Sequence, residues 1–133
     1  HDLNAPGVFV MKDTLYVHGS THQKDFPIWK SGNPTIDDWS IATDTLKVGA
    51  WDPAFYYDKE KDKLFLYWGS SNEFPLMGTE LNTITFQSDG FVKPMISLKP
   101  EDHGWERFGE YNDNTFLKPF LEGASVTKYN DKY

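Results

Sequence analysis

The sequence contains no cysteine. This absence excludes disulfide bonds, thiol catalysis and zinc sites built from thiolates. It does not identify the compartment, because many exported bacterial proteins also lack cysteine. We expect a periplasmic or extracellular bacterial location rather than a cytoplasmic one.

The chain also lacks a basic segment and a long hydrophobic run. Its 13 Lys and Arg are outnumbered by 20 Asp and Glu, and the net charge of -7 is spread along the chain. With no cluster of cations to neutralise phosphates, we expect no nucleic-acid partner. No stretch of about 18 apolar residues occurs, so we expect no membrane partner. The chain begins at His1 without a signal-peptide pattern, and we expect it to be a fragment of a longer chain.

Aromatic and turn-forming residues are abundant instead. Aromatic residues make up 17% of the 133 residues, with 10 Gly and 8 Pro, and no Ala-rich or Leu-rich helical segment is present. This composition favours many short strands joined by turns. The sequence therefore predicts an all-β fold for residues 1–133.

One motif occurs three times, starting near Ala5, Asp52 and Gly123. Each copy has a small or proline-containing start, a short apolar strand, a charged turn and an aromatic-rich return strand. The first two copies end alike, in "HGS" at 18–20 and "WGS" at 68–70. Hairpins repeated every 40 to 50 residues or so are typical of β-propeller blades. The longer second spacing indicates an insertion within one blade.

Further strands complete two blades. We expect strands at Phe26–Trp29, Trp39–Ala42, Gly78–Leu81 and Lys93–Leu98, turns at 32–34 and 88–90, and a loop over 99–119. A last hairpin is expected from a strand at Ala124–Tyr129 and a turn at Asn130-Asp131. The chain would then hold two blades and the first hairpin of a third, too few to close a propeller alone.

Two carboxylates occupy related positions in this repeat. Asp52 starts the second copy and Glu122 directly precedes the third. Because the innermost strands of propeller blades meet at the central channel, the repeat predicts that both side chains reach one pocket. Cleavage of a glycosidic bond requires such a pair. The alternative is that Asp52-Pro53 is a turn and Glu122-Gly123 the start of a loop, and the repeat favours the pocket.

The segments "WDPAFYYDKEKDKLFLYWG", "GTELN", "GWE" and "EGASVTKYNDKY", in this order, resemble glycoside hydrolase family 43. "NAPGVFVMKDTLYVHGS" resembles the blade before them. The family comprises five-bladed β-propeller β-xylosidases, α-L-arabinofuranosidases and arabinanases. The resemblance implies inverting hydrolysis of plant polysaccharides or oligosaccharides that contain arabinose or xylose.

The resemblance also assigns residue roles. Asp52 matches the aspartate that tunes the acid and orients the sugar, and Glu122 matches the general acid. No residue matches the general base, so we expect the isolated fragment to be inactive. Trp51, Asn4 and Trp105 are the predicted substrate-binding residues. Asn4 stands where family members often carry an aromatic residue, and the two indoles could stack on a sugar.

The remaining candidates have structural interpretations. Glu106 is a rival acid, but Arg107 beside it would keep it ionised, which favours a structural role. The other expectations are core packing for Trp29, Trp39 and Trp68; surface or loop positions, not metal ligation, for His18, His22 and His103; and a solvated turn at 58–62.

Three functional hypotheses stay open. Besides the glycosidase, these are a non-catalytic carbohydrate-binding propeller and a related neoagaro-oligosaccharide or fructan hydrolase. We expect no cofactor, although the complete propeller could hold a structural calcium ion. The expected partner is a carbohydrate.

Overall fold

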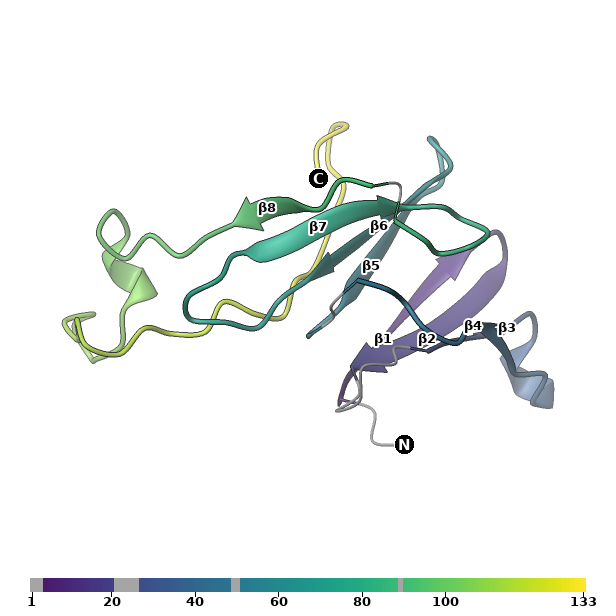
Figure 1. Cartoon of the computed structure of the whole chain (residues 1–133), viewed down its shortest axis with the longest axis horizontal. Helices are drawn as coiled ribbons and strands as arrows, with labels where there is room; N and C mark the ends of the chain where they lie inside the picture. Colours follow the sequence, from purple (N-terminus) through teal and green to yellow (C-terminus); the bar gives the residue numbers. More distant parts are fainter. Residues whose placement is uncertain (1–3, 21–26, 49–50, 89) are drawn as a thin grey trace.

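The protein, seen in a computed structural model, is described here for residues 4–20, 27–48, 51–88 and 90–133. It consists of two four-stranded antiparallel sheets, each in sequential strand order (Figure 1). The first contains β1 (Asn4–Met11), β2 (Thr14–Ser20), β3 (Ile28–Ser31) and β4 (Ser40–Thr43); the second contains β5 (Ala54–Asp58), β6 (Lys63–Trp68), β7 (Leu76–Leu81) and β8 (Lys93–Ile96). The all-β prediction is confirmed, as are two four-stranded units.

Local sequence explains the hairpins. The turn between β1 and β2 consists of Lys12 and Asp13, both at positive φ (51° and 59°), which matches the right-handed twist of the paired strands. In β6 the residues alternate between partly buried and buried, so that Leu64, Leu66 and Trp68 share one face of the sheet. Period-two patterning thus selects the face of the second sheet that enters the core.

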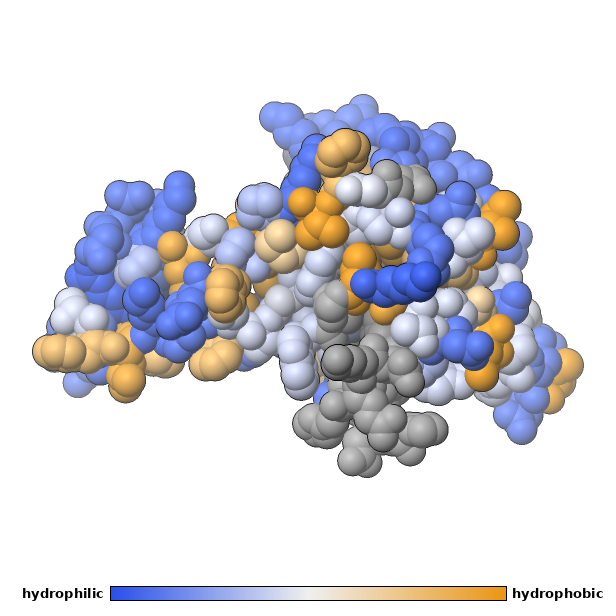
Figure 2. All heavy atoms as spheres, viewed as in Figure 1, coloured by the Kyte–Doolittle hydropathy of each residue, from blue (hydrophilic) through white to orange (hydrophobic). Residues whose placement is uncertain are grey.

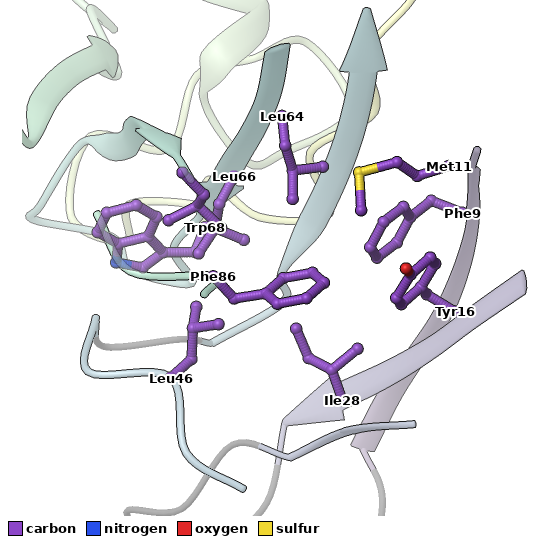
Figure 3. Packing of buried hydrophobic residues seen from close by; sticks show 10 residues of the cluster. Phe9, Met11, Tyr16, Ile28, Leu46, Leu64, Leu66, Trp68 and Phe86 are labelled. Carbon is purple, nitrogen blue, oxygen red and sulfur yellow. The ribbon is translucent and has the colours of Figure 1, made fainter. Parts of the chain in front are cut away.

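The hydrophobic core lies between the two sheets (Figure 3). Leu64 and Leu66 from β6 are fully buried there. Phe9 of β1 stacks on Tyr16 of β2 and on Phe55 of β5, in each case with ring centroids 4.8 Å apart. These contacts join the first strands of the two sheets, β1 and β5, which lie next to each other.

The core assignments for tryptophan are partly correct. Trp68 is buried, as predicted. Trp29 is half-buried on β3, whereas Trp39 precedes the short strand β4 and is 39% exposed, so its predicted core role is wrong. β4 forms the outer edge of its sheet, where no further described strand can cover the indole.

Asp58, expected in a solvated turn, is buried instead. One carboxylate oxygen accepts from the backbone amides of Glu60 (3.0 Å) and Lys61 (3.2 Å). The other accepts from the Tyr133 hydroxyl and lies 3.4 Å from Lys128 Nζ. The hydrogen bond from Tyr133 lowers the pKa of Asp58 to about 2. The prediction is correct for residues 59–62, which are exposed, and wrong for Asp58, because residues far along the chain cover it.

The last hairpin is only partly formed. Asn130 and Asp131 make the predicted turn, with positive φ at both residues and backbone bonds of 2.9 and 3.0 Å between Tyr129 and Lys132. The strand predicted for Ala124–Tyr129 is not present, because no described strand pairs with this segment.

Other boundaries differ slightly from expectation. β3 spans Ile28–Ser31 rather than Phe26–Trp29, and Phe26 lies outside the described residues, as do His22 and Asp89. β4, β7 and β8 differ from the predicted spans by one or two residues at their ends. Pro94 fits β8 because this strand is at the sheet edge, where a missing amide donor is tolerated.

A long loop follows β8, as predicted. It contains η2 (Gly104–Glu106), while the other short 3-10 helix, η1 (Pro34–Ile36), lies between β3 and β4. The loop extends away from the first sheet, at the left of Figure 1, and hydrophobic residues reach its surface in Figure 2. Phe116 is 95% exposed there. Among the described residues, no helix is long and apolar enough to cross a membrane.

Candidate functional site

The starts of the three repeat copies meet at one pocket. It has a volume of about 390 Å³ and is lined by residues 5–8 of β1, residues 52–55 at the start of β5, residues 123–126, and His18 of β2. The corresponding positions Pro6, Pro53 and Ala124 therefore lie around the same hollow. This arrangement agrees with the repeat, in which equivalent positions point toward a common axis.

Asp52 lines this pocket from the turn that leads into β5. Its φ of 49° is uncommon for a residue other than glycine. Its backbone amide donates to Ser20 Oγ at 3.2 Å, and the preceding carbonyl of Trp51 accepts from the Gly69 amide at 2.8 Å. Hydrogen bonds to both sheets thus fix the residues before β5, so that Asp52 has a defined position on the pocket wall.

Glu122 lies beside this pocket rather than in its wall. It lines a neighbouring pocket of about 630 Å³ that shares residues 123–126 with the first one. Its carboxylate accepts a hydrogen bond from Ser70 Oγ at 2.7 Å. The backbones of Ser71 and Leu121 exchange two hydrogen bonds, of 2.9 and 3.3 Å, which fix the segment before Glu122. Asp52 and the residue that follows Glu122 therefore line a common pocket.

His18 is the site residue that sequence reasoning missed. It was expected at the surface or in a loop, but it is 3% exposed and packs against Phe55, with ring centroids 4.7 Å apart. Burial lowers its pKa from the usual 6.5 to about 4, so the imidazole is neutral at pH 7. The repeat contained a usable signal, because His18 corresponds to Trp68, which is also buried.

Gly7 allows His18 to occupy this position. A methyl group at Gly7 would lie 2.6 Å from Cε1 and 2.7 Å from Nε2 of the imidazole. Gly7→Ala is therefore expected to lower the free energy of unfolding by about 1–3 kcal/mol, since the packed ring must shift. Urea denaturation checks this value. Gly104→Ala is the matched control, because no atom lies within 4 Å of the added methyl; an equal loss in both variants would contradict the steric explanation.

The predicted sugar-binding residues are less clearly placed. Trp51 is 53% exposed and Trp105 is 70% exposed, and neither is among the described residues that line the two pockets. Trp105 stacks on His103 at 4.4 Å in the loop after β8. The side-chain nitrogen of Asn4 is buried and has no hydrogen-bond partner among the described residues. Asn4 also lies outside the lining of both pockets.

Glu106 has a local structural contact. Its carboxylate accepts a hydrogen bond from the backbone amide of Lys99, which closes the loop around η2. Arg107 pairs with Glu101 at 3.5 Å, so the suggested pairing of Arg107 with Glu106 is replaced by this one. His103 lies in the same loop, as expected. Within the described parts of the chain, no group of three or more His, Asp or Glu side chains could hold a metal ion.

Comparison with known proteins gives a structural likeness without a sequence match. No family model and no curated protein matches the sequence. The chain is similar to the protein named "Bacteroides ovatus Xyloglucan PUL GH43B", with a TM-score of 0.51 and 20% identity over 68% of this chain and 18% of that one. It is also similar to "Exo-1,5-alpha-L-arabinanase from Bovine Ruminal Metagenomic Library", with a TM-score of 0.47 and 21% identity over 68% of this chain and 35% of that one.

At 20% sequence identity, the similarity to the first of these proteins shows a shared fold alone. The chain spans about a fifth of the length of the first protein and about a third of the second. The similarity is structural, because no family model matches the sequence. The matched 68% of this chain therefore has a fold similar to part of a glycoside hydrolase family 43 enzyme.

Proposed function

We propose that this chain forms part of the catalytic domain of an inverting glycoside hydrolase with a five-bladed β-propeller fold. The two sheets are two blades, and residues 123–133 begin a third. The substrate is a plant polysaccharide or oligosaccharide that contains arabinose or xylose. The observation that carries this proposal is the pocket at which the starts of all three repeats meet, with Asp52 in its wall and Glu122 beside it.

The chemistry divides between the two carboxylates. Glu122 is the general acid that donates a proton to the leaving-group oxygen, and Asp52 orients the sugar. In inverting enzymes the acid and the base stand roughly 6.5–9.5 Å apart, which leaves room for the attacking water. Among the described residues, Asp52 is the only carboxylate that lines the shared pocket. We therefore place the base outside the described residues.

The stereochemistry of the product tests this proposal. The complete protein that carries this sequence is incubated with 4-nitrophenyl β-xyloside and α-L-arabinofuranoside, and the anomeric proton of the released sugar is followed by NMR. Inversion is expected, because the water attacks from the face opposite the leaving group. Retention of configuration would contradict the three-carboxylate mechanism.

A non-catalytic carbohydrate-binding propeller is the second candidate. The absence of a carboxylate at the base position in the rest of the protein would favour it. Calorimetric titration with xylo- and arabino-oligosaccharides distinguishes the two. Binding to the complete protein without any release of sugar would support the binding protein.

A further inference from the structure

The geometry points to Ser70 as the positioning residue for the Glu122 carboxyl group. In both repeats, the serine that ends the first hairpin forms a hydrogen bond to a residue near the start of the next repeat copy. Ser70 Oγ lies 2.7 Å from Glu122 Oε2, and the two residues come from different repeats. This inference rests on the proposed glycosidase function. It adds a residue that neither the repeat nor the family resemblance assigned.

The serine at the same position in the first repeat also contacts a residue near the start of the next copy. Ser20, at the end of β2, corresponds to Ser70 after β6, and its Oγ accepts the backbone amide of Asp52 at 3.2 Å. Ser20 is 1% exposed. Each serine therefore bonds to the carboxylate residue that precedes or starts the next repeat. In one case the contact is to the backbone and in the other to the carboxylate itself.

Gly69, the residue before Ser70, contacts the segment that contains Asp52. Gly69 has a φ of 143°, and a side chain there would lie 3.0 Å from Leu76 Cδ2 and 3.3 Å from its Cα, so glycine is required. Its amide donates to the Trp51 carbonyl at 2.8 Å. One Gly-Ser pair thus binds the residue before Asp52 through Gly69 and binds Glu122 through Ser70.

The backbone next to Ser70 limits the movement of Glu122 further. Ser71 and Leu121 exchange two backbone hydrogen bonds, so the residues that directly adjoin Ser70 and Glu122 are paired. The carboxylate itself is exposed, and without a partner its side chain would sample several rotamers. The serine hydroxyl selects one of them. Because a general acid acts only from within hydrogen-bond reach of the leaving oxygen, this selection affects the proton-transfer step.

Dependence on the leaving group tests the role. From a 2,4-dinitrophenyl glycoside the dinitrophenolate leaves without a proton, whereas the leaving sugar of an oligosaccharide requires one. In the complete protein, Ser70→Ala is expected to lower kcat on a xylo- or arabino-oligosaccharide roughly tenfold, with KM within about twofold. Its kcat on the corresponding dinitrophenyl glycoside should stay within about twofold of wild type. Ser70→Thr, which keeps the hydroxyl, should restore the oligosaccharide activity.

Two further variants make the result decisive. Ser71→Ala removes a hydroxyl that accepts hydrogen bonds from the nearby backbone amides of Glu73 and Phe74, so any loss should be equal on both substrates. Ser70→Ala combined with Glu122→Gln should be no slower than Glu122→Gln alone. An equal loss on both substrates in Ser70→Ala, no loss on either, or failure of Ser70→Thr to restore activity overturns the positioning role. A wild-type protein that cleaves neither substrate overturns the proposed function as well.

Discussion

Glu122→Gln is expected to lower kcat on a xylo- or arabino-oligosaccharide by roughly 10²–10⁴, which is the usual contribution of a positioned general acid. Glutamine has nearly the same shape and can still accept the Ser70 hydrogen bond, which spans 2.7 Å in the wild-type structure. It cannot donate a catalytic proton. The variant should therefore fold and bind sugar normally while losing turnover, as measured by steady-state kinetics and calorimetric titration.

Glu106→Gln is the matched control for this result. Glu106 is the rival acid, and its structural contact with the Lys99 amide survives the substitution because the amide oxygen still accepts. Its activity should stay near that of wild type. The assignment of Glu122 would be wrong if the Glu122→Gln variant kept full activity, or if the loss appeared in the Glu106→Gln variant instead.

The second large effect concerns acid stability and originates at His18. Burial lowers the pKa of this imidazole from 6.5 to about 4, so between these values the unfolded chain binds a proton that the folded chain does not. Stabilisation is complete above pH 6.5 and is lost as the pH falls toward 4. For a side chain only 3% exposed, this shift corresponds to about 3 kcal/mol of unfolding free energy.

Urea denaturation between pH 7 and 4 measures this loss. His18→Leu removes the titrating group, so its stability should fall less steeply over this range than that of wild type. Trp68→Phe is the control, because Trp68 holds the corresponding position of the second repeat and its replacement removes no proton-binding group. This control should keep the wild-type slope. Identical slopes in wild type and His18→Leu would show that His18 does not cause the acid sensitivity.

The features that were predicted correctly depend on local sequence. The alternation in β6 and the turn residues Asn130 and Asp131 act through the backbone and the nearest neighbours, so the strand and the turn follow from residues a few positions apart. The repeat extended this reasoning over longer distances. It predicted that Asp52 and Glu122 would reach one pocket, whereas Asp52 lines one pocket and Glu122 lines the neighbouring one. The catalytic roles of Asp52 and Glu122 stay predictions.

The incorrect predictions concern residues whose surroundings come from distant parts of the chain. Asp58 looks like part of a solvated charged turn, yet Lys128 and Tyr133 cover it. His18 looks like a polar residue near a strand end, yet it lies opposite Gly7 and against Phe55. The strand expected from Ala124 to Tyr129 has the right residues but no strand beside it among the described residues.

The sequence by itself determined the all-β class, the hairpins, the repeat and the two carboxylates that begin its copies. These depend on residue spacing and turn chemistry, which act over a few residues or recur at a fixed period. Only the tertiary structure decided what each side chain faces: the burial of His18, the contacts of Asp58 and the hydrogen bond from Ser70 to Glu122. The physical reason is that hydrogen bonds and desolvation act across space, between residues that packing brings together from separate repeats.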